Sequence, residues 1–309
     1  MILSKCLGLP DKSIENNYIW PSFSEGFFML NYQGNLISEK DPILKYSNRG
    51  LNFGDALYED IKIVNGVLYF WEEHYLRLMS SMRILRMEIP MNFTMEFLES
   101  EIHKLIKANE LEEQPAFIRI MVYRADSPQL FQTNNEVRYL ISTEKGDAPF
   151  YTLSDDAYEV ELYKDFYCNA DMLSTLSSTN RLLSVTGSIY ARENGYQDCL
   201  LINASKNVVQ ALDGNLFLVK GNEVKTPPLS DGCRDGIIRR KMLEILQKTE
   251  GYEINEAPIS PFELQKADEL FITSIRKGIQ PVTKYRKAAY KTDVSRSLLG
   301  KLNAMARLA

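Results

Sequence analysis

The sequence predicts a two-domain protein of mixed α+β and α/β class, with a first domain over residues 1–145 and a second over 146–309. Stretches with the apolar spacing of strands alternate with stretches that have the spacing of helices in both halves. Residues 144–149 are polar and contain glycine and proline, which is typical of a linker. With 309 residues, 45% of them hydrophobic, the chain is long enough to form a core in each half.

The first half is expected to combine strands with two amphipathic helices. Asn65-Gly66 between two apolar runs is a strong hairpin signal, and Gln33-Gly34-Asn35 marks another turn. Two later segments have apolar residues at helical spacing. The expected strands cover residues 27–32, 58–64, 67–70, 116–123 and 136–142, and the expected helices cover 72–87 and 94–109.

The second half repeats the alternation of strands and helices. Gly195 is expected to close a helix, because glycine tolerates the left-handed backbone that ends many helices. Asp293 is expected to cap the last helix. The expected strands cover residues 159–163, 199–202, 215–219, 223–225 and 270–274, and the expected helices cover 179–194, 236–248 and 293–308.

Composition excludes several classes of function. The formal net charge is -5 and basic residues are scattered among acids, which argues against a nucleic-acid binder. No apolar run approaches the roughly 18 residues of a membrane span. The four cysteines are widely spaced, and the N-terminus lacks the long apolar core of a signal peptide, so we expect a cytoplasmic protein. Two histidines without a cluster of other ligands predict no metal site.

A series of different short motifs follows in a fixed order along most of the chain, from about Gly34 to Val282. They cover residues 48–59, 73–78, 178–182, 193–196, 214–217, 226–232, 236–239 and 269–273. Each fragment is weak alone, but their order and spacing are specific. Together they resemble the class IV pyridoxal-phosphate enzymes, which include branched-chain and D-amino-acid aminotransferases and aminodeoxychorismate lyase. The resemblance implies the two-domain D-amino-acid aminotransferase-like fold (fold type IV) and a homodimer whose sites are completed at its interface.

The resemblance also implies a lysine three residues before Asn180, which would carry the cofactor as an internal aldimine. This chain has Ser177 there, and a serine cannot form a Schiff base. A family glutamate five residues before Asn215 would keep the pyridine nitrogen protonated. Here the position is Gln210, whose neutral amide cannot supply that charge. Pyridoxal phosphate is therefore expected by resemblance only, without covalent attachment.

The positions that match the family's phosphate site are changed in part. Its Gly-Ile-Thr run reads Gly236-Ile237-Ile238, which loses one hydroxyl but keeps a helix N-terminus. The second phosphate loop reads Ile275-Arg276-Lys277, where small or hydroxyl residues are usual. Arg77 matches the phosphate-binding arginine and is expected to contact an anion through two N–H groups.

On the substrate side, the resemblance implies roles for Tyr58, Asp60 and Lys62, which share one face of a strand by their spacing of two. Arg119 matches a substrate-facing arginine of a central strand. The arginine and histidine that hold the substrate carboxylate in D-amino-acid enzymes are missing, because Ser127-Pro128 is followed by residues 129–131 of sequence Gln-Leu-Phe.

Two functional hypotheses follow. The first is a protein of this family with a degenerate site, which cannot form the internal aldimine and binds an anionic or phosphorylated small molecule or acts as a non-catalytic homologue. The second is an active pyridoxal-phosphate aminotransferase or 4-amino-4-deoxychorismate lyase in which Lys164, Lys206 or Lys225 supplies the amine. Ser177 as a nucleophile has little support, because no GxSxG motif surrounds it.

Overall fold

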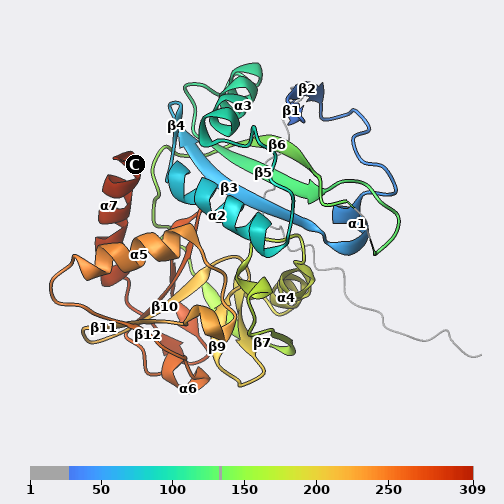
Figure 1. Cartoon of the computed structure of the whole chain (residues 1–309). Helices are drawn as coiled ribbons and strands as arrows, with labels where there is room; N and C mark the ends of the chain where they lie inside the picture. The colour runs from blue at the N-terminus through green and yellow to red at the C-terminus, as the bar shows by residue number, and fades with distance from the viewer. Residues whose placement is uncertain (1–27, 132–133, 309) are drawn as a thin grey trace, which may run out of the picture.

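The computed structural model describes residues 28–131 and 134–308, which build three β-sheets flanked by helices (Figure 1). We call residues 28–145 the N-terminal half and 146–308 the C-terminal half. Figure 1 shows the N-terminal half, blue to green, above the C-terminal half, yellow-green to red. The expected mixed fold with strands in both halves is confirmed. The domain boundary at residue 145 stays a prediction.

The N-terminal half contains one six-stranded antiparallel sheet in the order β2-β1-β6-β5-β3-β4. Helices α2 and α3 pack on it, and their apolar faces form one buried cluster with the inward side chains of the strands. The elements are β1 Met29–Tyr32, β2 Asn35–Ser38, α1 Arg49–Phe53, β3 Ala56–Val64, β4 Val67–Leu68, α2 Trp71–Ile84, α3 Met95–Ala108, β5 Ala116–Arg124 and β6 Val137–Lys145.

The C-terminal half contains two five-stranded sheets, in the orders β16-β15-β7-β8-β9 and β12-β11-β10-β13-β14. Side chains from both sheets share a buried apolar cluster between them. The strands are β7 Glu159–Cys168, β8 Asp198–Asn203, β9 Val208–Ala211, β10 Asn215–Lys220, β11 Glu223–Thr226, β12 Glu253–Glu256, β13 Glu269–Ser274, β14 Gly278–Val282, β15 Lys284–Tyr285 and β16 Ala288–Ala289. The helices are α4 Leu182–Glu193, α5 Ile237–Gln247, α6 Pro261–Leu264 and α7 Asp293–Arg307.

The two halves share part of a core. Tyr69 and Phe70, between β4 and α2, belong to a buried cluster formed mainly by β10, β13, α5 and α7. In that cluster Phe217 and Phe271 stack with ring centroids 5.0 Å apart. Because apolar burial is the main stabilising contribution, this shared cluster fixes the N-terminal half against the C-terminal half.

Several expected boundaries are wrong. Phe70 has a left-handed backbone, with φ of 56°, and precedes α2, so strand β4 ends at Leu68. Residues 144 and 145 continue β6 by pairing with β5, so the linker begins only after them. Thr179 donates its backbone N–H to Ala56, which delays the start of α4 to Leu182. Asp293 is the first helical residue of α7 and not its cap. Phe27 of the first expected strand lies outside the described residues.

No helix in the described part of the chain is long and apolar enough to cross a membrane. Within residues 28–131 and 134–308, no group of three or more histidine, cysteine or acidic side chains is placed to hold a metal ion.

Candidate functional site

A small cavity of about 50 Å³ lies where the two halves meet. Strand β3 and helix α2 supply its N-terminal wall, and the C-terminal half supplies the rest through the β9–β10 turn, the start of α5 and the β13–β14 loop. This volume corresponds to a few water molecules. The lining residues are Tyr58, Asp60, Arg77, Ser177, Asp213, Gly214, Asn215, Arg234, Gly236, Ile237, Ile238, Thr273, Ser274, Ile275 and Arg276.

Ser177 lies on the cavity wall in a segment that is fixed to β3. Its carbonyl accepts the backbone N–H of Tyr58 at 2.8 Å, and Ser178 forms a β-bridge with Leu57. The residue is 6% exposed, so position 177 faces the interior. No lysine lines the cavity among the residues that the structure describes. The wall therefore presents no amine to a bound molecule.

Arg77 lines the cavity, but Glu59 and the Asp235 carbonyl together accept three of its five side-chain N–H groups. The Arg77 Nε and Nη2 atoms donate to Glu59 at 2.8 and 2.6 Å, and Nη1 donates to the Asp235 carbonyl at 2.7 Å. The Nε–Nη2 edge is therefore not available to a phosphate. A guanidinium carries five N–H groups, so one on Nη1 and one on Nη2 remain.

Glu59 is the buried acid that orients both α2 side chains. His74 Nδ1 lies 2.7 Å from Glu59 Oε2, and both side chains are almost fully buried. Burial raises the pKa of Glu59, but the charge of Arg77 and the hydrogen bonds from His74 and Arg77 outweigh it and leave that pKa below its ordinary value. Burial lowers the pKa of His74. The group is therefore an Arg77–Glu59 ion pair with a neutral histidine behind it.

Gln210 is buried in β9 and lies outside the cavity wall. Its Oε1 atom accepts the backbone N–H of Arg234 at 2.8 Å, so this oxygen holds the loop before α5. The sequence singled out Gln210 as a partner for a cofactor ring nitrogen. In the structure its effect on the cavity passes through Arg234.

The start of α5 forms the C-terminal wall. Gly236 is the N-cap, and a Cβ there would lie 2.2 Å from Asn215 Oδ1, so only glycine fits this close approach. Ile237 and Ile238 line the cavity, and no side chain caps the N–H groups of this first turn. A helix N-terminus with unsatisfied N–H groups favours anions.

Thr273 provides a hydroxyl at this wall that the sequence interpretation missed. The residue is 2% exposed and lines the cavity, and its Oγ1 atom has no hydrogen-bond partner in the described structure. It pairs directly with Asn215 across strands β10 and β13, so both side chains project on the same face, toward α5. Its place beside the changed Ile275-Arg276 loop was the one available signal.

The β13–β14 loop directs its two cations differently. Arg276 lines the cavity, donates to Glu144 at 2.6 Å and lies 5.0 Å from the Phe117 ring centroid. Ile275 also lines the cavity. Lys277 turns away and donates to the Tyr158 hydroxyl at 3.1 Å. Only one of the two loop cations is therefore available at the cavity.

Of the four residues expected on the substrate side, Tyr58 and Asp60 line the cavity. Arg119 stands behind them, donating through Nε and Nη2 to Asp60 at 2.7 Å each, with its guanidinium 4.7 Å from the Tyr58 ring centroid. Lys62 is buried beside Tyr151, 4.5 Å from its ring centroid, and is not part of the wall. Burial lowers the pKa of the Lys62 amine.

Arg234 and Arg181 were not predicted from the sequence. Both donate through Nη2 to the same oxygen, Asp213 Oδ1, at 3.1 Å. Arg234 also donates to the Tyr58 hydroxyl at 3.4 Å, and its side chain extends from the C-terminal half toward β3. Arg181 lies in the motif at residues 178–182, but nothing in the sequence pairs it with Arg234, because the two converge from the start of α4 and the loop before α5.

Comparison with known proteins agrees with this architecture. The family model described as amino-transferase class IV matches residues 56–285. The chain belongs to this family. A Methanocaldococcus jannaschii protein whose name assigns it as a branched-chain-amino-acid aminotransferase is 30% identical over 81% of this chain and 85% of its own length.

Solved class IV structures have the same fold. The branched-chain aminotransferase of Thermoproteus uzoniensis superposes with a TM-score of 0.80 and 23% identity, covering 90% of this chain and 94% of that one. A Legionella pneumophila protein named as a 4-amino-4-deoxychorismate lyase gives 0.76 and 22%, covering 86% and 97%. The resemblance to class IV enzymes is confirmed, and members of the family use pyridoxal phosphate.

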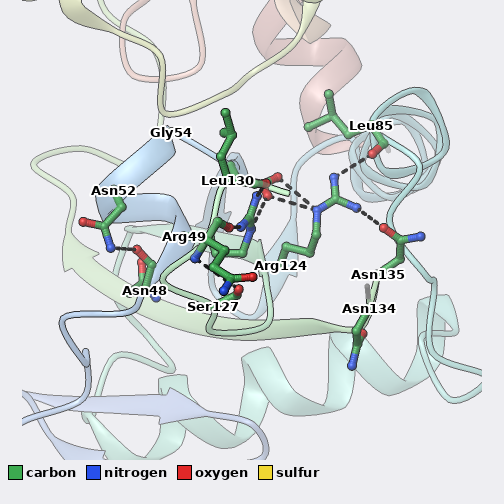
Figure 2. Close-up of polar contacts among 12 residues, drawn as sticks. Asn48, Arg49, Asn52, Gly54, Leu85, Arg124, Ser127, Leu130, Asn134 and Asn135 are labelled. Carbon is green, nitrogen blue, oxygen red and sulfur yellow. Dashed lines mark hydrogen bonds and ion pairs between the residues drawn. The ribbon is translucent and has the colours of Figure 1, made fainter. Parts of the chain in front are cut away.

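The loop after β5 is held by two arginines in this class IV chain (Figure 2). Arg49 donates to the carbonyls of Gln129 and Leu130 at 2.5 and 3.2 Å. Arg124 donates to the Leu85 carbonyl at 2.7 Å and to Asn135 at 2.8 Å. The carbonyls of Gln129 and Leu130 accept hydrogen bonds from Arg49, so the main chain after Ser127-Pro128 has a structural role. The Leu130 side chain is exposed.

Proposed function

We propose that this chain is a class IV aminotransferase-family protein with a degenerate cofactor site, which forms no internal aldimine and binds a small anionic or phosphorylated molecule in the cavity. The observation that carries the proposal is Ser177 on a cavity wall that includes no lysine among the described residues. An aldimine needs an amine nitrogen, and the reaction class of the family begins from that linkage.

The three lysines considered as substitutes lie elsewhere. Lys225 is paired with Glu263 at 2.7 Å, Lys206 contacts Tyr167, and Lys164 is exposed on β7. None of them is among the cavity-lining residues. Using one of these amines would require moving its strand or turn toward α5. This supports the hypothesis that the protein forms no internal aldimine.

The residues present do not fit a covalently held pyridoxal phosphate. Position 210 has a neutral amide whose oxygen already accepts the Arg234 N–H, so this residue supplies no charge to a ring nitrogen. Arg234 extends across this region to the Tyr58 hydroxyl. We therefore derive no chemical step through this cofactor.

Anion binding is supported by donors that converge at one end of the cavity. The remaining Arg77 N–H groups, the unpartnered Thr273 hydroxyl and the open N–H groups at the start of α5 all belong to this wall. Charge-assisted hydrogen bonds and the helix N-terminus both favour an oxyanion such as phosphate. We call this set the α5 end of the cavity.

An active class IV aminotransferase or 4-amino-4-deoxychorismate lyase remains the second candidate, favoured by the names of the relatives. Borohydride reduction of the native protein, followed by peptide mapping, separates the two. We expect no pyridoxyl-modified lysine. A modified lysine in the native protein would establish the second candidate and reject the first.

A double variant tests the site assignment directly. Ser177→Lys with Gln210→Glu, incubated with pyridoxal phosphate, should gain more aldimine absorbance than either single variant. The lysine supplies the amine, and the glutamate supplies the carboxylate that would keep the ring nitrogen protonated. Ser188→Lys with Gln210→Glu is the matched control, since Ser188 is exposed on α4. Equal absorbance in the double variant and the control would contradict the placement of Ser177 and Gln210.

We also infer a homodimer, as is typical of the family, and a reducing cytoplasmic location. The cysteines within the described residues, Cys168, Cys199 and Cys233, are buried free thiols, which supports a reducing compartment. Support for the dimer comes from exposed apolar residues on α4, treated below.

A further inference from the structure

One group of charges at the edge of the cavity is not balanced; Asp213 and Arg234 of this group line the cavity, and Arg181 lies behind them. Arg77 is paired with Glu59, Arg119 with Asp60 and Arg276 with Glu144. Asp213, in contrast, is shared by Arg181 and Arg234, each at 3.1 Å from its Oδ1 atom. Among the described residues at the cavity, this group therefore carries one positive charge more than its acid compensates.

The two guanidinium groups also have unused donors. Within the described structure Arg234 uses two of its five side-chain N–H groups, one on Tyr58 and one on Asp213. Arg181 uses only Nη2, on Asp213 and the Leu212 carbonyl. Burial lowers the pKa of Arg181, and the nearby charge of Arg234 adds to that effect. Burial also acts to lower the pKa of Arg234, but Tyr58 and the acids Asp213 and Asp60 outweigh it and raise that pKa. The support for another anionic group is therefore the set of unused donors.

We propose that the cavity's ligand carries a carboxylate, which replaces Asp213 on Arg181 and Arg234. The proposal rests on the anionic ligand of the proposed function and adds its chemical class. Asp213 itself shows that a carboxylate oxygen fits between the two guanidinium groups. Arginine donors match the planar carboxylate, and the Tyr58 hydroxyl beside Arg234 supplies one more donor.

The arginines are held in place independently of Asp213. The Arg234 backbone N–H is bound by Gln210 at 2.8 Å and its carbonyl by Asn215 Nδ2 at 2.7 Å. Arg181 Nη2 is bound by the Leu212 carbonyl at 2.6 Å. The Asp213 side chain is 64% exposed on the turn between β9 and β10, so it can move into water while Arg181 keeps the Leu212 carbonyl and Arg234 keeps the Tyr58 hydroxyl. Asp213 therefore acts as an internal competitor for the ligand's carboxylate.

Because Asp213 competes with the ligand, substitutions of Asp213 and of the two arginines should change ligand affinity in opposite directions. Malonate, a small dicarboxylate, is titrated by calorimetry into the full chain at low salt, with malonamide as the neutral control. Asp213→Asn should bind malonate about tenfold more tightly, because it removes the competing charge. Arg234→Gln and Arg181→Gln should each bind it at least about tenfold more weakly. A gain in affinity cannot result from a misfolded variant.

Arg296→Gln is the matched control, because Arg296 pairs with Asp155 on the surface and should leave malonate affinity unchanged. Unchanged or weaker malonate binding in Asp213→Asn would overturn the proposal, as would equal loss in Arg296→Gln and Arg234→Gln. Inorganic phosphate, titrated into the same variants, reports on the α5 end. Thr273→Val should weaken phosphate binding and leave malonate binding unchanged. If the native chain binds no phosphate, the proposed anion site at the α5 end is contradicted, and the carboxylate proposal is tested separately by malonate.

Discussion

At the scale of single residues, Asp198 is a buried carboxyl group close to the cavity. Its Oδ1 atom accepts the backbone N–H groups of Cys199 and Leu212 at 2.7 and 3.3 Å, and Oδ2 accepts the Tyr158 hydroxyl at 3.1 Å. Burial outweighs these bonds and raises the pKa of Asp198 to about 6. Asp198 accepts the Leu212 N–H, and Leu212 precedes Asp213, so the Asp198 carboxyl group lies directly behind the β9–β10 turn.

The raised pKa predicts how Asp198 changes stability with pH. Because the folded state holds the proton more tightly, the group's stabilising contribution is fully present below about pH 4 and is lost as pH rises to about 6. The shift of about 2 units corresponds to about 2 to 3 kcal/mol. In Asp198→Asn the amide oxygen can retain both backbone bonds. Urea unfolding at pH 4 and pH 6.5 should show the variant gaining that amount relative to the native chain, and a pH-independent difference would contradict the assignment.

At the scale of elements, α4 has two different faces. Gly187 packs so closely on the β9–β10 turn that a Cβ there would lie 2.5 Å from Leu212 Cδ2. On the exposed side, Leu182, Val185 and Ile189 are 75%, 50% and 40% exposed, at helical spacing. Contiguous exposed apolar surface is typical of an interaction site, which supports α4 as part of the inferred dimer interface.

Val185→Glu should weaken the inferred homodimer, because it places a charge in the centre of this apolar face. Multi-angle light scattering over a dilution series should show the native chain as a dimer and the variant dissociating at higher concentration. Ser188→Glu adds the same charge to an exposed polar position of α4 and is the control. A native monomer, or a Val185→Glu protein that dissociates no more readily than the control, would exclude this face.

At the scale of the whole molecule, the site depends on the two halves being held together. Phe70 is 1% exposed and lies in a cluster otherwise formed largely by the C-terminal half. The Arg77 contact with the Asp235 carbonyl and the Arg276 pair with Glu144 also cross from one half to the other. A molecule built in this way is expected to unfold as one cooperative unit.

Phe70→Ala should destabilise the whole chain by about 3 to 5 kcal/mol, because it leaves a hole in the shared core. Unfolding in urea is followed by far-UV circular dichroism and by tryptophan fluorescence, to which Trp71 contributes. Both signals should change in one coincident transition that moves to lower urea. Phe262→Ala, at a 75% exposed position, should have little effect. Two separate transitions in the native chain would show that the halves fold independently.

The sequence predicted more of the fold than of the site. The Asn65-Gly66 hairpin and the helical period of α2 and α3 are local signals, and they gave elements close to those observed. The beginning of α4 could not be predicted, because residues 178 and 179 are drawn into pairing with β3, more than a hundred residues earlier. Short strands such as β2 and β9 had no clear pattern of their own.

The sequence by itself determined the family, the order of the elements and the serine at position 177, because motif spacing and residue identity need no coordinates. Only the tertiary structure decided that Glu59 binds the Nε–Nη2 edge of Arg77, and that Arg181 and Arg234 converge on Asp213. Side-chain partners depend on which distant strands and loops meet in space. Ion pairs form over a few ångströms regardless of sequence separation, so charges far apart in the chain decide the chemistry of this cavity.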